Sequence, residues 1–337
     1  MNYVLTTFAQ EQVDKYLARI AALNGVAVDK LHKTFAVAPA PQQSLEKAIQ
    51  ESVDFFKLIQ NIGVVNQKGD KLGLAVASIM ASRTNTGAGN RRNPQDRTSF
   101  NEDKYECVFT EYDSSLPYAK LDAWAHLRNF QQVAAMALAI AQALTIIMVG
   151  FNGTGVVAQT NSITNPLGQD VNIGWLEKIR LFAPTNHLSG MVIKAAGGGD
   201  YRTLDGLVTD MRQTLIHPRY RNDPQMVAII GRGLMNAEML ELVDNQSAAT
   251  EKLAADVIVK NSRVGGLPWK DVPHFPDDAV LITRPDNLSR YYQLSGRRRH
   301  VKDEPEYSRL ASYDSSNDAY VVEEYECAAL ADGITRA

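Results

Sequence analysis

The chain has 337 residues, of which 45% are hydrophobic and 22% charged, as in an ordinary globular protein. With 35 lysines and arginines against 38 aspartates and glutamates, the formal net charge is −3. This composition excludes wholesale disorder, a collagen-like chain and a disulfide scaffold. The near-neutral charge also disfavours a protein that coats nucleic acid. The length allows roughly two domains with a sizeable buried core.

The two cysteines, Cys107 and Cys327, stand far apart and outside any CxxC pattern. A disulfide framework needs several closely spaced pairs, so this usage predicts two reduced thiols in a cytosolic protein. Near the N-terminus, Glu11 and Asp14 interrupt the sequence before an apolar run of signal-peptide length can form. The sequence therefore predicts no secretory leader.

The first predicted helix covers residues 10–23, where apolar residues recur at helical spacing before the stop signal Asn24-Gly25. The stretch AVAPAPQQ at 36–43 follows, and its alanines and prolines predict an extended linker. Residues 44–60 favour a second helix. We therefore expect either a small N-terminal unit hung on a linker or an N-terminal helix docked on the body.

Residues 62–79 and 104–116 have extended character, and the polar segment 80–103 between them is rich in Gly, Asn, Thr and Arg. Together they predict a long two-stranded excursion with a polar tip, and Lys68-Gly69-Asp70 predicts a turn. Because an isolated two-stranded hairpin is only marginally stable in water, we expect this excursion to rest on a partner chain. A loop folded back over its own domain is the alternative.

Residues 121–149 predict one long helix, about 43 Å at about 1.5 Å per residue, which glycines end. No Asp, Glu, Lys or Arg lies between Arg128 and Asp170. A membrane span needs about 20 apolar residues, and the apolar run 133–149 is shorter than that. We therefore expect a long buried helix, called the spine helix below, and keep a transmembrane helix as the alternative. The expected apolar stripe is Leu127, Phe130, Ala134, Ala137, Ala141, Leu144 and Met148, opposite a weakly polar face of Arg128, Gln131, Ala135, Ala139 and Gln142.

The second half of the chain first alternates helices and strands in the manner of a compact α/β unit and then becomes rich in strands. Helices are predicted at 175–182, 204–215 and 234–243, and strands at 226–230, 256–260, 279–283, 288–293 and 319–327. The chain as a whole is therefore predicted to be an α+β protein.

Few motifs point to catalysis. GFNGTG at 150–155 is followed by two valines where a phosphate loop needs Lys and Ser or Thr. GRGLMN at 231–236 follows a strand and opens a helix, as a dinucleotide fingerprint does, but Asn236 replaces the third glycine. A nucleotide-binding enzyme centred on Gly231 is therefore only a distant alternative.

The remaining reactive side chains also lack the patterns that chemistry requires. The six histidines show no metal-ligand spacing, HExxH and GxSxG are absent, and neither cysteine has a nucleophile signature. The sequence predicts no catalytic residue, no cofactor and no metal. A spine helix, a long hairpin and a detachable N-terminus together suggest a subunit of an assembly.

Two groups of basic residues remain. One lies next to acidic residues near the C-terminus and the other lies in the polar excursion. We interpret both as ion-pair sites, either local or between subunits, and keep nucleic-acid contact as the alternative. The inter-subunit contacts are assigned, as a hypothesis, to Arg83, Arg91, Arg92, Arg97, Arg297, Arg298 and Arg299.

Long stretches of the chain carry a family resemblance. In order they are IQESVDFF (49–56), KGDKLGLAV (68–76), NEDKYEC (101–107), LDAWAHLRNFQ (121–131), IIMVGFNG (146–153), NPLGQDVNIGWLEK (165–178), GGGDYRTLDGLV (197–208), AADVIV (254–259) and LPWKDVPHFPDDAVLITRPDNLSRYY (267–292). With these stretches the chain resembles the major capsid proteins of P2-like tailed bacteriophages, over roughly residues 13–332. So long a series in order is far more specific than a short motif.

The resemblance implies an α+β fold of the HK97-like capsid type, with its parts in a fixed order along the chain. These parts would be a removable N-terminal segment (1–35), an N-terminal arm (36–60), an extended β-hairpin loop (61–118), the spine helix of the peripheral domain (119–152), an axial domain (153–272) and the closing strands of the peripheral domain (273–337).

The resemblance also implies a function. Many copies would form hexamers and pentamers that close, without covalent cross-links, into an icosahedral shell around double-stranded DNA in the bacterial cytoplasm. Expected partners are an internal scaffold-protease, a portal at one vertex and DNA held by weak contacts. The protease would cut near Phe35-Ala36. An encapsulin-like nanocompartment, which shares the shell fold, is the alternative.

Overall fold

The computed structural model describes residues 7–76, 83–85, 91, 98–124, 130–195, 197–237 and 263–336. Within these ranges the chain mixes helices and strands, as predicted for an α+β protein. Several predicted features lie wholly or partly outside them: the polar tip at 80–103, the strand at 256–260 and the second half of the helix at 234–243.

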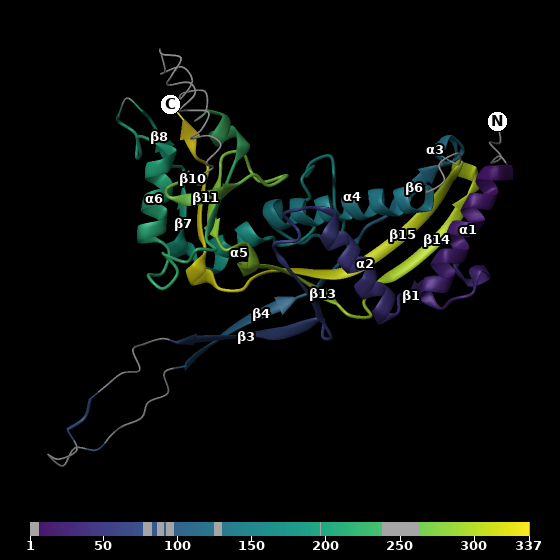
Figure 1. The fold of residues 1–337 in the computed structure, drawn as a ribbon, viewed down its shortest axis with the longest axis horizontal. Helices are drawn as coiled ribbons and strands as arrows, with labels where there is room; N and C mark the ends of the chain where they lie inside the picture. The colour runs from purple at the N-terminus through teal and green to yellow at the C-terminus, as the bar shows by residue number, and fades with distance from the viewer. Residues whose placement is uncertain are drawn as a thin grey trace.

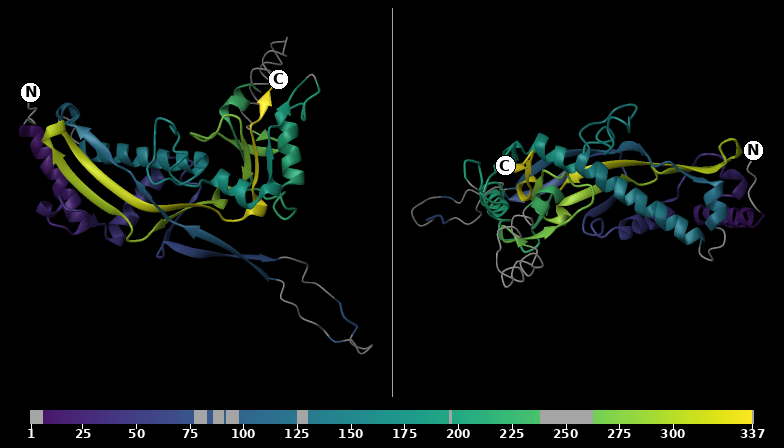
Figure 2. Two further views of the ribbon diagram at one scale, coloured as in Figure 1. Left: turned by 180° about the vertical axis from the view of Figure 1, so that it is seen from behind. Right: turned by 90° about the horizontal axis from the view of Figure 1, so that it is seen from above.

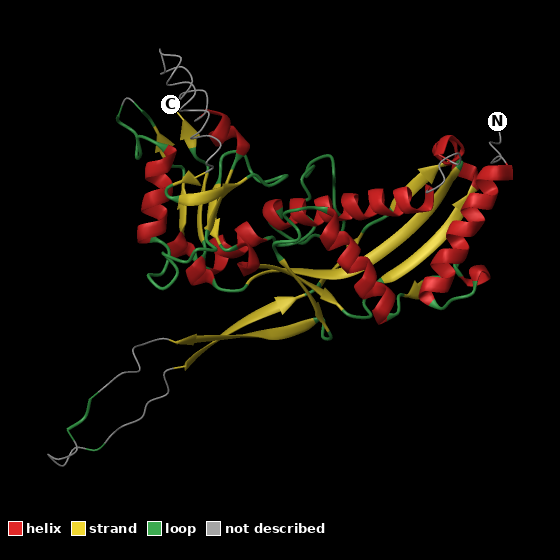
Figure 3. Cartoon of the chain, viewed as in Figure 1, coloured by secondary structure: helices red, strands yellow, loops and turns green. Residues whose placement is uncertain are grey.

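The molecule is elongated, with two lobes and a projecting hairpin (Figure 1). In the larger lobe, helices lie against a long curved sheet, and the smaller lobe holds a second sheet with helix α6 beside it (Figure 3). The helices whose ends both lie in the described residues are α1 (Thr7–Asn24), α2 (Pro39–Ser52), α3 (Tyr118–Trp124), α4 (Phe130–Asn152), α5 (Trp175–Phe182) and α6 (Leu204–Thr214). Residues 232–237 are helical as well. Short 3-10 turns lie at Val28–Lys30, Pro184–Asn186, Pro285–Asn287, Pro305–Tyr307 and Tyr325–Cys327.

The larger lobe is organised around its longest strand, β15, which pairs with β13, β14, β5 and β6. All these pairs are antiparallel, whereas β2 joins β13 in parallel and β1 pairs with β14 at the edge. The strands are β1 (Phe35–Ala36), β2 (Gln60–Val64), β5 (Val108–Glu111), β6 (Ser114–Pro117), β13 (Leu288–Gln293), β14 (Arg298–Glu304) and β15 (Arg309–Val322).

The smaller lobe contains a mixed sheet of order β10-β11-β9-β12-β16-β7. Its strands are β7 (His187–Ser189), β9 (Val227–Ile230), β10 (Arg263–Val264), β11 (Leu267–Lys270), β12 (Val280–Thr283) and β16 (Ala329–Asp332). Two further pairs are β8 (Val192–Ile193) with β17 (Thr335–Arg336), and β3 (Lys68–Val76) with β4 (Thr98–Glu106). The predicted strands at 226–230, 279–283 and 288–293 are thereby confirmed within a residue.

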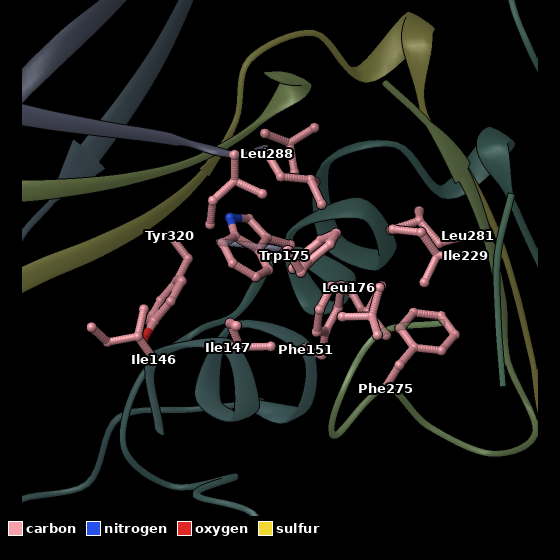
Figure 4. Close-up of a cluster of buried hydrophobic side chains, with 14 of the residues drawn as sticks. Ile146, Ile147, Phe151, Trp175, Leu176, Ile229, Phe275, Leu281, Leu288 and Tyr320 are labelled. Carbon is pink, nitrogen blue, oxygen red and sulfur yellow. The ribbon is translucent and has the colours of Figure 1, made fainter. Parts of the chain in front are cut away.

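A hydrophobic core joins the two lobes, and Trp175 at the start of α5 lies at its centre (Figure 4). The indole is fully buried and donates a hydrogen bond from Nε1 to the Ser289 carbonyl at 2.9 Å. Its ring meets Phe151 and Tyr320 edge-on, at centroid distances of 5.1 and 5.2 Å. Such pairs add to the free energy of burying a large ring, so Trp175 holds α4, α5 and the large sheet together.

A second core fills the smaller lobe. Leu204, Leu207, Val208 and Met211 follow the spacing of a helix with one apolar face, and all four side chains are buried against the sheet. Thr203 caps this helix by accepting a hydrogen bond from the Gly206 amide at 3.1 Å. The helix predicted from these residues is confirmed as α6.

The predicted linker at 36–43 is wrong. Only Phe35–Ala36 are in a strand, and α2 begins at Pro39 after the extended residue Ala38. Proline is tolerated in the first turn of a helix because its missing N–H would have no partner there. The same helix ends at Ser52, where Val53 turns extended, so the helix predicted to reach residue 60 is shorter and lies further upstream.

The spine helix is found, but its buried face differs from the predicted stripe. The described parts are α3 and α4, and 125–129 lie outside the described residues. Ala139, predicted on the weakly polar face, is buried with Ala143 and Ile147, whereas Ala137 and Ala141 are exposed. The alanine-rich sequence offers too little contrast between its faces to fix which one is buried.

One helix among the described residues, Gln132–Asn152, is long and apolar enough to cross a membrane by length and composition alone. Its second half packs into the core beneath Trp175, where Ile146 and Phe151 are buried. Core helices of globular proteins pass the same test, so its composition is weak support for a membrane span.

Candidate assembly surfaces

The hairpin β3–β4 extends away from both lobes in Figure 1 and in the left view of Figure 2. Its strands pair in regular antiparallel register from Lys68↔Glu106 to Val76↔Thr98. The long excursion predicted from sequence is therefore confirmed. The turn predicted at 68–70 is wrong, because these residues begin β3 and the bend lies at 65–67.

Contacts at the base hold the hairpin to the larger lobe. The Lys71 ammonium donates to the Val322 carbonyl at 2.6 Å, and the Tyr105 and Tyr291 rings meet at a centroid distance of 5.1 Å. Beyond this base the hairpin stands apart from its own body (Figure 2). Of the arginines predicted to make contacts from it, Arg83 and Arg91 are exposed, and Arg92 and Arg97 lie outside the described residues.

The second basic group comprises Arg297, immediately before β14, and Arg298 and Arg299, the first two residues of β14. Because successive side chains of a strand point to opposite faces of the sheet, these arginines differ in burial. Arg298 is exposed and Arg299 half-buried, but Arg297 is only 1% exposed. Its guanidinium donates twice to Asp314, from Nε at 2.9 Å and from Nη2 at 2.5 Å. The prediction that Arg297 contacts a neighbouring subunit is therefore wrong, because the chain itself surrounds and pairs this side chain.

Arg297 is part of a buried ion-pair network that sequence reasoning missed. Glu46 of α2 accepts hydrogen bonds from Arg290 Nη1 at 2.5 Å and from Arg297 Nη1 at 2.8 Å. Arg290 Nη2 also donates to Asp318 at 2.8 Å. All five side chains are at most 6% exposed. One carboxylate of α2 thus bridges two arginines of the sheet region.

Neutral groups complete the network. Tyr112 donates to Asp318 at 2.6 Å and Ser316 to the same carboxylate at 2.9 Å, while Gln142 of α4 accepts from Arg297 at 3.2 Å. Burial alone would raise the pKa of Glu46, but the charges of Arg290 and Arg297 outweigh it and hold that pKa below its ordinary value. The carboxylate is therefore ionised at neutral pH.

The N-terminal helix α1 is docked on the larger lobe, as one of the two sequence alternatives expects. Val13, Ile20 and Leu31 are buried against Val301 of β14 and Leu310 of β15. This cluster is separate from the core around Trp175 and from that of the smaller lobe. The segment is thus attached by a small apolar patch of its own.

The bond between Phe35 and Ala36, the predicted processing site, lies within β1. Phe35 is paired with Arg299 and Ala36 with Arg298. On either side of β1, the Val37 amide donates to the Arg297 carbonyl at 3.0 Å and the Val301 amide donates to the Leu31 carbonyl at 3.2 Å. The bond therefore sits at the outer edge of the large sheet.

A groove of about 1120 Å³ lies between α1, α2 and α4. Ile20, Leu45 and Met136 contribute apolar surface to it, and Arg19 and Arg299 also line it. Met136 is 62% exposed. The groove therefore combines an apolar wall with charged side chains of both signs, because Glu51, Glu111 and Asp113 line it as well.

The glycines of the two motifs GFNGTG and GRGLMN allow neighbouring parts of the chain to pack closely. A Cβ on Gly150 would lie 2.3 Å from the Trp175 ring, and one on Gly153 would lie 2.1 Å from the Asn172 carbonyl oxygen. In GRGLMN, a Cβ on Gly231 would lie 2.3 Å from the Asp277 carbonyl oxygen. Close approach of neighbouring groups explains these glycines without a bound nucleotide.

The prediction that Cys107 and Cys327 form no disulfide bond is confirmed. Both thiols are free and buried, and burial raises the pKa of Cys107 to about 12 and that of Cys327 to about 11. They are therefore protonated and unreactive at neutral pH. Among the described residues, no group of three His, Cys, Asp or Glu side chains could hold a metal ion.

A long helix on a curved sheet, a second α/β lobe and a projecting hairpin define a shell-forming subunit with the HK97-like capsid fold. Residues 12–334 match the family described as phage major capsid protein, P2 family. The chain belongs to this family, whose members are structural proteins of the capsid and not enzymes.

Two curated relatives agree with this family. The chain is 39% identical over 329 residues to a protein named capsid proteins from Escherichia phage P2, covering 95% of this chain and 92% of that one. It is 38% identical over 341 residues to the major capsid protein of Serratia phage KSP20, covering 98% of each.

Solved structures agree as well. The chain is similar to one described as the satellite phage P4 procapsid including size determination (Sid) protein, with a TM-score of 0.78 and 36% identity over 97% of this chain and 98% of that one. The capsid of a native GTA particle, 14% identical with a TM-score of 0.50 over 84% and 91% of the two chains, shares the fold alone.

Proposed function

We propose that copies of this chain form hexamers and pentamers that close into the icosahedral shell of a tailed phage, assembled in the host cytoplasm around double-stranded DNA. The observation that carries this proposal is the hairpin β3–β4, which leaves its own body (Figure 2). Because such a hairpin is marginal alone, it is stabilised by lying across a neighbouring copy. Exposed Arg83, Arg91 and Arg298 supply ion pairs at these contacts, together with Arg92, Arg97 and Arg299.

The structural role that we propose for each segment follows the order of segments expected from the sequence. The extended loop (61–118) makes contacts between copies, the spine helix (119–152) and closing strands (273–337) form a peripheral domain, and residues 153–272 form an axial domain. An internal scaffold-protease and a portal are the proposed partners, and the packaged DNA is held by weak contacts.

Electron microscopy of the chain co-expressed with its scaffold tests this function. Closed icosahedral shells are expected, and boiled particles are expected to give a single band at the mass of one chain, which is 37.2 kDa for the full chain and lower once the first 35 residues are removed. Small soluble oligomers in place of shells would contradict the assembly proposal. A high-mass ladder from intact shells would contradict only the absence of covalent links between copies.

We also propose that the first 35 residues are removed by cleavage between Phe35 and Ala36. Support comes from the separate apolar cluster of α1, since its removal disturbs neither of the two larger cores. Intact-mass measurement of mature particles is expected to give a chain beginning at Ala36. Shells of the mature size that retain Met1 would refute processing while leaving the assembly proposal intact.

A further inference from the structure

The loop that joins α4 to α5 displays an unusual amount of apolar surface. Ile163 is 91% exposed, the largest exposure of any large hydrophobic side chain among the described residues. Val156 and Val157 are 48% and 47% exposed, and Leu167 is 37% exposed. Four apolar side chains in so short a segment are more than the scattered exposure that a soluble protein surface normally shows.

Hydrogen bonds fix the shape of this loop. At its base, the Thr154 and Gly155 amides both donate to the Gln169 carbonyl, at 2.8 and 3.1 Å. Further along, the Asp170 carboxylate accepts from the Asn161 amide at 2.7 Å and from the Asn165 side chain at 3.0 Å.

The tip around Ile163 is held in the same way. The Asn161 side-chain oxygen accepts from the Ile163 amide at 3.0 Å and from the Thr164 amide at 3.3 Å. Ile163 is therefore presented on a preformed backbone, and little conformational entropy remains to be lost on binding.

The charge of the loop limits what it can bind. No Lys, Arg or His lies between Arg128 and Lys178, so the loop offers no cationic side chain to a nucleic-acid phosphate. Asp170, the acidic residue of the loop, is occupied by Asn161 and Asn165. An apolar protein surface is therefore a better complement to this loop than a nucleic-acid backbone.

We propose that the loop 154–170 docks through Ile163 on a second copy of this chain. The chain belongs to a family of major capsid proteins, so in the shell proposed above each copy is surrounded chiefly by other copies. The receiving surface is a different patch of the neighbour, which makes the contact heterologous and able to close into a ring. Interface anchors are side chains that fill well-packed pockets of the partner, and Ile163 on its fixed backbone can serve as one.

A photoreactive benzophenone amino acid placed at position 163 of the full chain tests the contact directly. In assembled shells, irradiation is expected to yield a covalent adduct with the mass of two copies of this chain. Adducts with a different protein, or only single-copy mass from intact shells, would overturn the proposal. If the chain with its natural residue forms no shells under the same conditions, it is the assembly proposal that fails.

The variant Ile163→Asp tests the energetic role, with Ile163→Leu as its matched control. Because Ile163 is exposed in the single chain, thermal unfolding should be unchanged in both variants. The protein concentration needed for assembly is expected to rise by about tenfold or more for Ile163→Asp and to stay unchanged for Ile163→Leu. Normal assembly of a folded Ile163→Asp chain would contradict the proposal.

Discussion

Replacing Glu46 by alanine is expected to lower the free energy of unfolding by about 3–5 kcal/mol, measured by denaturant titration of the unassembled chain. The carboxylate is the shared partner of Arg290 and Arg297, whose guanidinium groups are at most 1% exposed. Without it, each arginine keeps one carboxylate partner, Asp318 for Arg290 and Asp314 for Arg297. The two Nη1 groups that donate to Glu46 lose that charged acceptor in a region from which water is excluded. Breaking a buried ion pair by removing one partner is far more costly than losing a surface ion pair, because the charged donors left behind stay desolvated.

Glu51→Ala is the matched control on the same helix. Glu51 is 63% exposed and lies 3.7 Å from Lys47, so its loss should change stability by less than about 0.5 kcal/mol.

Because the pKa of Glu46 is lowered in the folded state, its stabilisation is fully present above the ordinary value of 4.5 and is lost as pH falls below it. The difference between the unchanged chain and Glu46→Ala should therefore shrink in acid. A difference that is small at pH 7 would contradict the role given to the network.

Trp175→Ala is expected to lower the free energy of unfolding by about 3–5 kcal/mol, because it removes the largest side chain at the junction of the two lobes. The indole contacts Phe151 and Tyr320 and donates a hydrogen bond to the Ser289 carbonyl. A cavity would remain between α4, α5 and the large sheet, and the Ser289 carbonyl would lose its donor. Denaturant unfolding of the unassembled chain measures the loss.

Phe182→Ala, on the same short helix, is the control for this substitution. Phe182 is 58% exposed, so its truncation should cost about 1 kcal/mol or less. Equal effects of the two substitutions would show that α5 is held by its exposed face and would contradict the central place of Trp175.

The elements best predicted from sequence are those whose two faces differ strongly. In α6 the apolar spacing separates buried from exposed positions, and the strand Val227–Ile230 is an uninterrupted apolar run. The alanine-rich α4 lacks such contrast, so its position along the chain could be predicted but its buried face could not. The linker prediction fails for a different reason: prolines favour an extended chain, but Pro39 occupies the first turn of α2, where proline is tolerated.

The ion-pair network could not be predicted from local sequence. Glu46 and Arg290 are 244 positions apart, and no spacing rule relates residues at that distance. One local signal was present: Gln42 and Glu46 share a helical face with Ile49, and all three are buried. Polar residues aligned with an apolar one indicate a buried polar contact, although they do not identify its partner.

If the first 35 residues are removed as proposed, the position of Phe35 and Ala36 in β1 limits when the cut can be made. A protease acts on a segment that has left its sheet, so the rate of cutting follows the fraction of copies in which β1 is detached. A two-residue edge strand needs only a local opening for this, without unfolding of either lobe. The stability of the pairing between β1 and β14 would then determine the rate of the proposed cleavage. Any contact between copies that displaces β14 would change the fraction of copies in which β1 is detached. It would thereby change the rate at which the first 35 residues are removed.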